Sequence, residues 1–200
     1  MIKQIPLLLL SAIVCLAVGC NNKAEDDKTV LRQTVEKMNE HVMKEEFQQV
    51  IGYMHPESFQ TFTAAEMLEG FKGSMHNENY DMKVKEFIVD SVSKVYPTDT
   101  SKFAVVAHHA IAEFHIKVDS TKSKADQENE MNQNCINMKT ILGDKYVTCH
   151  LDERNIDVMM PDRTYFIYSP SRKKWLAVLK SNQTALDKLI PADIKAKLDR

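Results

Sequence analysis

The chain has 200 residues, of which 26 are basic and 28 acidic, and its formal net charge is −2. A nucleic-acid-binding domain normally carries a basic excess, so this near balance argues against nucleic acid as a partner. Five glycines and six prolines are too few for a low-complexity chain. The length is sufficient for one well-packed domain.

The first residues combine one basic side chain, Lys3, with an apolar stretch from Leu7 to Val18. A short positive region followed by about a dozen apolar residues is typical of a secretory signal. The stretch is shorter than the about 20 residues that a membrane-spanning helix needs. We therefore expect residues 1–19 to be a cleaved signal segment, and a buried terminal helix is the alternative.

The apolar stretch ends in Leu16-Ala17-Val18-Gly19-Cys20, which resembles a bacterial lipobox, with Ala17 standing where leucine is commoner. The resemblance implies diacylglycerol on the Cys20 thiol, cleavage before Cys20, and a fatty acyl chain such as palmitate on the new amine. Two or more fatty chains hold a protein stably at a membrane. Cys20 is therefore the expected lipid attachment site, and the lipid bilayer is the expected partner.

Residues 20–27 are polar, and we expect them to form a tether between the lipid and the domain. Their Lys23-Ala24-Glu25-Asp26-Asp27 run resembles the export signal of Bacteroidetes surface lipoproteins, and an acidic helix start is the alternative. These features predict an extracytoplasmic protein of the bacterial cell envelope, lipid-anchored at the outer membrane and facing the periplasm or the surface. Ordinary cleavage with an unmodified Cys20 is the other interpretation.

Residues 28–200 are expected to form a single domain that begins with helices. Apolar residues spaced by three, four and seven predict one long helix over 28–54. Thr63 and Glu66 fit a capping box, which predicts a helix over 64–75. Alternating residues predict strands over 83–95 and 103–118.

The second half of the chain is expected to hold short strands. Two interpretations are open for the start of this second half. One is a helix over 128–141 that ends at Gly143, and the other is a hairpin over 135–150 that turns at Gly143-Asp144. Turns at 152–155 and at Pro161-Asp162 then separate strands over 146–151, 156–160 and 163–168. A hairpin leads to a strand over 175–179, and a helix over 184–198 is interrupted at Pro191.

Helices followed by antiparallel strands predict the α+β class, with the N-terminal helices packed on a curved antiparallel sheet. This order, together with the hairpin of residues 165–168 and 175–178, resembles the NTF2-like (SnoaL-like) cone fold over residues 28–180. The C-terminal segment around Leu189-Ile190-Pro191 is an addition to that fold. A cystatin-like sheet wrapped on one helix is the structural alternative.

Cleavage removes Cys15 and acylation occupies Cys20, which leaves Cys135 and Cys149 in the domain. In an oxidising envelope these two thiols are a candidate disulfide, and two buried free thiols are the alternative. Two cysteines without a Cys-x-x-Cys motif do not predict a zinc site.

The strand over 103–118 carries several titratable side chains. Strand alternation puts His109, Glu113 and His115 on one face. At about 3.3 Å per residue, His109 and His115 lie about 20 Å apart and cannot share a metal ion. Glu113 and His115 could share a metal ion only with a ligand from a neighbouring strand, for which His150 is a candidate, and we expect no metal. With Asp90 as a further acid–base candidate, the candidate pocket residues are Asp90, His109, Glu113 and His115.

No nucleophile elbow, phosphate loop, dinucleotide fingerprint or His-Glu-x-x-His motif occurs, so we expect no cofactor. The sequence therefore favours a non-catalytic domain that binds a small apolar ligand or an envelope protein. A pocket enzyme of the isomerase or dehydratase type, which the cone-fold resemblance implies, is one alternative. A structural envelope component is the other.

Overall fold

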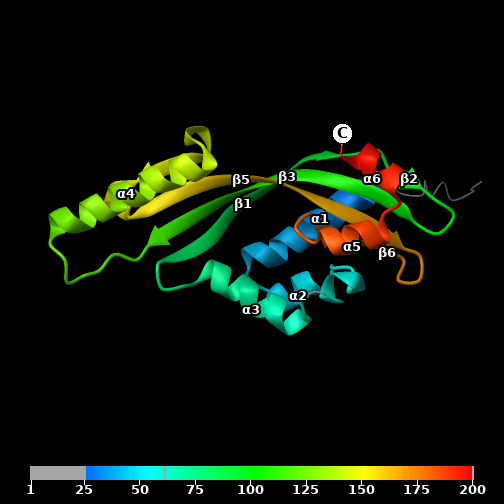
Figure 1. Cartoon of the computed structure of the whole chain (residues 1–200), viewed down its shortest axis with the longest axis horizontal. Coiled ribbons are helices and arrows are strands. Elements are labelled where there is room, and N and C mark those ends of the chain that lie inside the picture. Colours follow the sequence, from blue (N-terminus) through cyan, green and yellow to red (C-terminus); the bar gives the residue numbers. More distant parts are fainter. Residues whose placement is uncertain (1–25, 61, 200) are drawn as a thin grey trace, which may run out of the picture.

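The computed structural model describes residues 26–60 and 62–199, and in it long antiparallel strands form one curled sheet with helices packed on it (Figure 1). The signal segment, Cys20 and the tether up to residue 25 lie outside the described residues. The expected α+β class with a curved antiparallel sheet is confirmed. No described helix has the length and apolar character needed to cross a membrane.

Three long strands make up most of the sheet: β1 (Tyr80–Val92), β3 (Lys102–Ile116) and β5 (Asn155–Ser169). Shorter strands are added at the margins: β2 (Tyr96–Pro97) beside β3, and β4 (Val147–His150) and β6 (Lys174–Leu179) beside β5. The path through the sheet is β1-β3-β5-β4, with every pair antiparallel.

The helices are α1 (Asp27–Met43), α2 (Phe47–Ile51), α3 (Ala64–Met75), α4 (Lys124–Leu142), α5 (Gln183–Leu189) and α6 (Ala192–Leu198). The described residues also form three 3-10 turns: η2 (Pro56–Gln60) between α2 and α3, η3 (Asp144–Tyr146) between α4 and β4, and η4 (Leu151–Glu153) between β4 and β5. The predicted capping box of α3 is confirmed, because the Thr63 hydroxyl accepts a hydrogen bond from the Glu66 amide and the Glu66 carboxylate accepts one from the Thr63 amide.

The prediction of one helix over 28–54 is wrong. The chain leaves the helical path between α1 and α2, where Glu45 has a left-handed backbone with φ 57°. Apolar spacing gives the reason, because Val42 and Phe47 are five residues apart and would not share a face on one straight helix. The break gives α2 a direction of its own, so that its residues Phe47, Val50 and Ile51 are buried independently of the buried side of α1.

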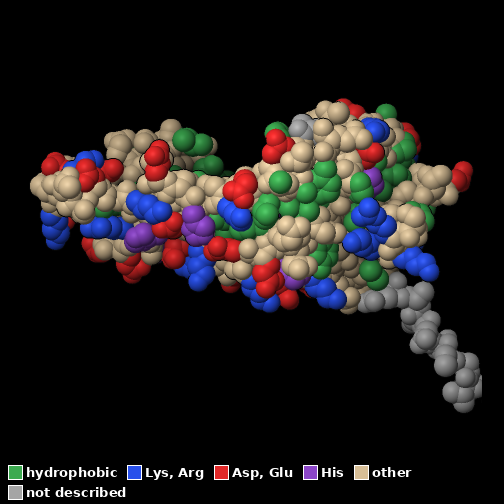
Figure 2. Space-filling model, turned by 90° about the horizontal axis from the view of Figure 1, so that it is seen from below, with side chains coloured by type: hydrophobic (Ala, Val, Ile, Leu, Met, Phe, Trp, Pro, Cys, Tyr) green, Lys and Arg blue, Asp and Glu red, His purple; other side chains and the backbone are tan. Residues whose placement is uncertain are grey.

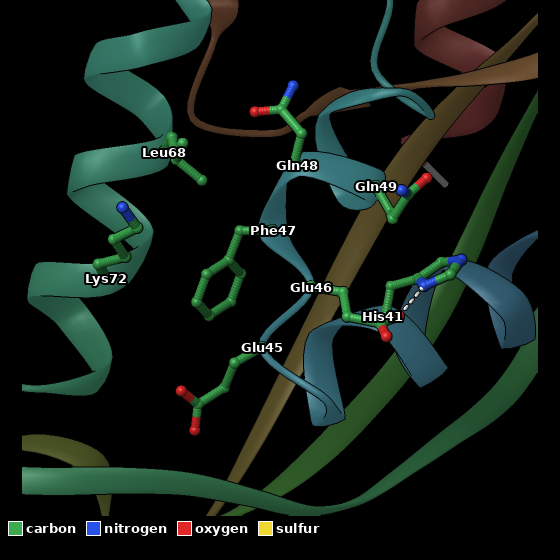
Figure 3. Close-up of a pocket in the computed structure, with 8 residues that line it drawn as sticks. All are labelled: His41, Glu45, Glu46, Phe47, Gln48, Gln49, Leu68 and Lys72. Carbon is green, nitrogen blue, oxygen red and sulfur yellow. Dashed lines mark hydrogen bonds and ion pairs between the residues drawn. The ribbon is translucent and has the colours of Figure 1, made fainter.

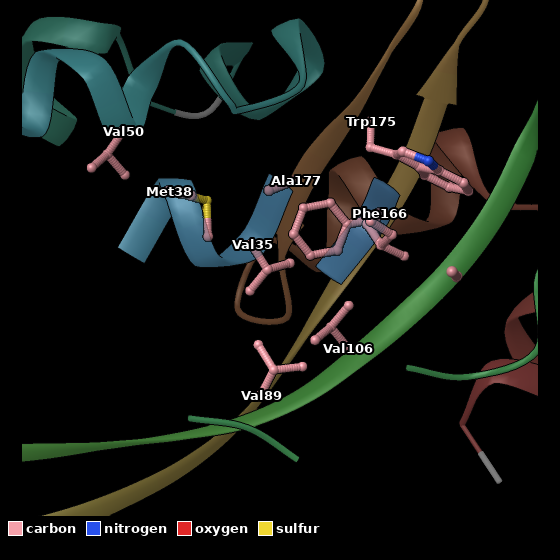
Figure 4. Close-up of a cluster of buried hydrophobic side chains, with 10 residues drawn as sticks. Val35, Met38, Val50, Val89, Val106, Phe166, Trp175 and Ala177 are labelled. Carbon is pink, nitrogen blue, oxygen red and sulfur yellow. The ribbon is translucent and has the colours of Figure 1, made fainter. Parts of the chain in front are cut away.

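The two faces of the sheet can be followed along β3 and β5, which pair without interruption from Lys102↔Tyr168 to His115↔Asn155. We call the face with Val106, Ala112 and Ile116 the inner face. Near one end, α1 packs on it in a cluster drawn in Figure 4, which consists of Leu31, Val35, Met38, Val50, Val89, Ala104, Val106, Phe166, Trp175 and Ala177. This cluster is the main core of the domain.

At the other end of the sheet, α4 packs on the same inner face, where Met131 and Cys135 contact Ile116, Ile156 and Val158. Figure 1 nevertheless draws α4 on the upper side of the sheet and α1 on the lower side. Long strands twist steadily along their length, so one face of the sheet turns over between its two ends. The twist divides the core into separate clusters, and α2 and α3 bury a smaller one around Phe47, Met75 and Val84.

Among residues 26–60 and 62–199, helices cover the outer face of the sheet only at the α1 end. There α5 and α6 bury Leu186, Ile190, Ile194 and Leu198 against Val105, Tyr165, Ile167 and Val178. Towards the α4 end, the outer-face side chains of β1, β3, β5 and β4 stay exposed or half-buried. This uncovered part of the sheet holds the candidate site.

One further prediction, about the second half of the chain, is wrong. Residues 155–169 form the single strand β5 rather than two strands with a turn at Pro161-Asp162, and Pro161 pairs with His109. Between Val158, where β4 ends its pairing, and Thr164, where β6 begins, the second edge of β5 has no strand partner in the described part of the chain. Proline therefore removes no ladder hydrogen bond on that side.

Of the two interpretations of residues 128–150, the helix ending at Gly143 is confirmed as α4, and the alternative hairpin over 135–150 is absent because α4 occupies most of that range. The helix begins four residues before the expected position, with the Ser123 hydroxyl capping the Asp126 amide, and Gly143 ends it with φ 97°. A disulfide joins Cys135 on α4 to Cys149 on β4, with their Cα atoms 6.1 Å apart. It ties α4 to the sheet end whose outer face is open.

Candidate functional site

The candidate site is the uncovered outer face of the sheet at the α4 end, which we call the open face. Its polar side chains are Lys83, Lys85, Glu113, His115, Thr148, His150, Asn155 and Asp157. Figure 2 views the molecule from below and shows lysine, acidic and histidine side chains crowded together at this end. Both signs of charge are present, so the open face is not a single-sign patch.

Two β-bulges in β1 direct charged side chains onto the outer face. The register with β3 shifts between Val84 and Glu86 and again between Val89 and Ser91, so Lys85 and Asp90 are the extra residues. A bulge changes the direction of a side chain relative to the regular alternation. Lys85 thereby reaches Glu113 at 3.1 Å, and Asp90 reaches His109 at 2.8 Å.

Lys85 lies between two carboxylates. Its ammonium is 3.1 Å from a Glu113 oxygen and 3.5 Å from an Asp157 oxygen. The hydrogen bond to Glu113 and the charge of Asp157 raise the pKa of Lys85, and so stabilise its charged form. The other Asp157 oxygen is buried and has no hydrogen-bond partner among the described residues.

The two histidines of the open face are each oriented by a neighbour on the next strand. The His115 Nδ1 and the Asn155 amide oxygen are 2.8 Å apart, which indicates that Nδ1–H donates. The His150 Nε2 lies 3.3 Å from an Asp157 oxygen. Within the described part of the chain, the second ring nitrogen of each histidine makes no hydrogen bond, so both rings present a polar atom at the surface.

An apolar strip runs beside these polar residues. It consists of Ile88, Ile111, Met159 and Pro161, which the pairing brings onto adjacent strands. Ile88 and Met159 are 42% and 38% exposed, which is high for large apolar side chains. An apolar centre with a polar margin is the usual composition of a protein–protein interface.

The four predicted pocket residues fall on the predicted face, but they do not converge on one point. Asp90 pairs with His109, Glu113 with Lys85, and His115 with Asn155. They are spread over about 20 Å, the length of six strand residues. Sequence reasoning missed Lys85, Asp157 and Asn155, although the imperfect alternation over 83–92 was a signal for a bulge.

A broad hollow of about 630 Å³ lies elsewhere, between the end of α1, α2 and α3 (Figure 3). It is lined by His41, Glu45, Glu46, Phe47, Gln48, Gln49, Leu68 and Lys72. Phe47 and Leu68 provide its apolar wall, and none of the four predicted pocket residues lines it. The hollow has no arrangement of groups that defines a ligand.

His108 is a buried titratable group of the sheet, and its role is structural. Its Nε2 lies 2.9 Å from the Thr164 hydroxyl, and its ring packs on Phe87 with ring centres 4.6 Å apart. Burial lowers the pKa of His108 and favours the neutral ring. Across residues 26–60 and 62–199, no group of three or more His, Cys, Asp or Glu side chains is arranged to hold a metal ion.

Comparisons of the chain with protein-family models, with curated proteins and with solved structures returned no match. The functional argument therefore depends on the site itself.

Proposed function

We propose that this chain is a bacterial envelope lipoprotein, anchored at the outer membrane through acylated Cys20, whose domain binds a protein partner at the open face. The anchor is supported by the signal-like segment and the lipobox resemblance, which lie outside the described residues. The binding role is supported by one observation above all: the apolar strip lies exposed beside paired charges of both signs.

The position of the open face is compatible with an anchored binding domain. At the opposite end of β3, Lys102 pairs with Asp27 of α1 at 2.7 Å. His115 lies 13 residues further along the strand, which corresponds to about 43 Å. The segment from Cys20 to Asp27 spans at most about 24 Å when extended. A tether of this length leaves the open face free to stand away from the bilayer.

A protein partner fits the open face better than a small apolar ligand does. Small-molecule sites are concave and mostly apolar, whereas this surface belongs to an open sheet with exposed charged side chains. The same observation disfavours the pocket-enzyme alternative. Fold resemblance alone would not supply a reaction.

We further propose that the domain has the NTF2-like cone fold. The packing of α1 on the curled sheet and the β5–β6 hairpin support this assignment. On this view α4, inserted between β3 and β4, and the C-terminal pair α5 and α6 are additions to the cone.

The anchor is tested by replacing its attachment residue. In cells fed an alkyne fatty acid, we expect the parent chain to be labelled and to fractionate with membranes. Cys20→Ala is expected to lose both properties, whereas Cys15→Ala, in the same N-terminal segment, keeps them. A Cys20→Ala chain that fractionates with membranes as the parent does would refute the anchor.

The binding role is tested by site-specific photo-cross-linking in cells. A photoreactive residue at Thr148, exposed on the open face, is expected to give one discrete protein adduct. The matched control is Gln133, exposed on α4. Ile88→Glu in the apolar strip is expected to abolish the Thr148 adduct without changing the circular dichroism spectrum. An adduct that forms equally from Gln133, or that survives Ile88→Glu, contradicts the proposal.

A further inference from the structure

One histidine connects the α1–α2 turn with the start of β1. His76 follows α3, and its Nε2 lies 3.0 Å from a carboxylate oxygen of Glu45. Its Nδ1 lies 3.1 Å from a carboxylate oxygen of Asp81, the second residue of β1. Lys117, just after β3, pairs with the same Asp81 oxygen at 2.8 Å. His76, at the end of α3, therefore contacts both the α1–α2 turn and the start of β1, while Lys117 contacts only Asp81.

The geometry requires a charged imidazole. A carboxylate only accepts hydrogen bonds, and a neutral imidazole carries one N–H. Only the imidazolium, with two N–H groups, can donate to Glu45 and Asp81 at once. Loss of one proton leaves a nitrogen lone pair facing a carboxylate, so at most one of the two contacts survives.

The turn that His76 holds is an unfavourable one. Glu45 has φ 57°, a left-handed conformation that side-chain-bearing residues rarely adopt. The carboxylate of the next residue, Glu46, lies 2.6 Å from the Nδ1 atom of His41. Both glutamates line the hollow between α1, α2 and α3 (Figure 3). Moving this turn would change the shape of that hollow.

The nearby lysine of α3 does not compete with His76 for Glu45 or Asp81. Lys72, also lining the hollow, pairs with Glu69 of its own helix at 3.0 Å. The His76 side chain is 48% exposed, so its protonation follows the pH of the solvent. The hydrogen bonds to Glu45 and then to Asp81 raise the pKa of His76.

We propose that His76 is a proton-operated link that ties the α1–α2 turn to β1 while its ring is charged and releases the turn when its ring is neutral, because a backbone bridge between His76 and Asp81 keeps His76 beside β1 in either state. Below its raised pKa the link is complete, and above it the turn beside the hollow loosens. The described geometry thus gives the domain a local response to the pH of the envelope.

The link is tested by amide hydrogen exchange and by NMR titration of the mature chain, residues 20–200, carrying Cys20→Ser. As pH rises through the His76 titration, protection of the Glu45 and Glu46 amides, corrected for intrinsic rates, is expected to fall by about two- to fivefold, as for an exposed ion pair. His76→Gln should remove this step. His115→Gln, whose ring contacts an amide rather than a carboxylate, should retain it.

A second variant covers the case in which His76→Gln fails to fold. Glu45→Gln removes one acceptor anion from the surface, so it is expected to lower the pKa of His76 and to abolish the protection step. The proposal is refuted if the parent shows no step across the His76 titration. It is equally refuted if the step persists in Glu45→Gln or if the pKa of His76 does not fall in that variant.

Discussion

Removing the Cys135–Cys149 disulfide is expected to destabilise the domain by about 3 kcal/mol. The two residues are 14 apart in sequence, and the loop-entropy model gives about this value for a closed loop of that length. Besides the disulfide, α4 is attached mainly through the buried Met131, the partly buried Met138 and a hydrogen bond from Arg154 to Gln127, whereas Ile136 and Ile141 are 55% and 79% exposed. The disulfide therefore carries a large share of the attachment of α4.

The assay is urea unfolding of residues 20–200 with Cys20→Ser, and of the same protein with both Cys135→Ser and Cys149→Ser. With a slope of about 2 kcal/mol per molar urea, a loss of about 3 kcal/mol lowers the midpoint by about 1.5 M. Thr148→Ser, an exposed neighbour on β4, is the matched control and should leave the midpoint nearly unchanged.

Hydrogen exchange locates the effect. Amides of α4 should exchange faster in the double variant, while those of α1 keep their protection, because α1 packs in a separate cluster. The open face lies on the strands that α4 supports from behind, so its cross-linking should weaken too. An unchanged midpoint together with unchanged α4 protection would show that the helix is held by packing alone.

Three other substitutions test the fold. Phe166→Ala, at a fully buried position of the α1 cluster, should cost about 3–5 kcal/mol in urea unfolding, whereas Phe62→Ala, 56% exposed, should cost little. Thr63→Ala removes the cap of α3 and should cost about 1 kcal/mol, a loss that Thr63→Ser would largely avoid. The pKa of His108 is lowered by burial, so its contribution to stability is present above about pH 6.5, the unfolded value, and is lost as pH falls towards the folded value. The free energy of unfolding, measured from pH 7.5 to pH 5, should fall in the parent and fall less in His108→Gln. An equal dependence of that free energy on pH in the two proteins would contradict the role given to His108.

The sequence by itself determined the features that depend on neighbours along the chain. The capping box at Thr63 and Glu66 defines the start of α3 through contacts three residues apart. The alternation in β1 and β3 defines strands because successive side chains point to opposite faces. The order of helices and strands then gave the α+β class. The same alternation placed His109, Glu113 and His115 on one face.

The tertiary structure decided the features that depend on partners distant in sequence. Pro161 lies inside a strand because no strand of the described residues pairs with the edge of β5 beside it, and that gap is visible only in the assembled sheet. The break at Glu45 is stabilised by His76, 31 residues away. Lys85 meets Glu113 and Asp157 only because a bulge and two strand registers bring them together. Local pattern carries no information on register between strands, and for that reason the open face could not be assembled from the sequence.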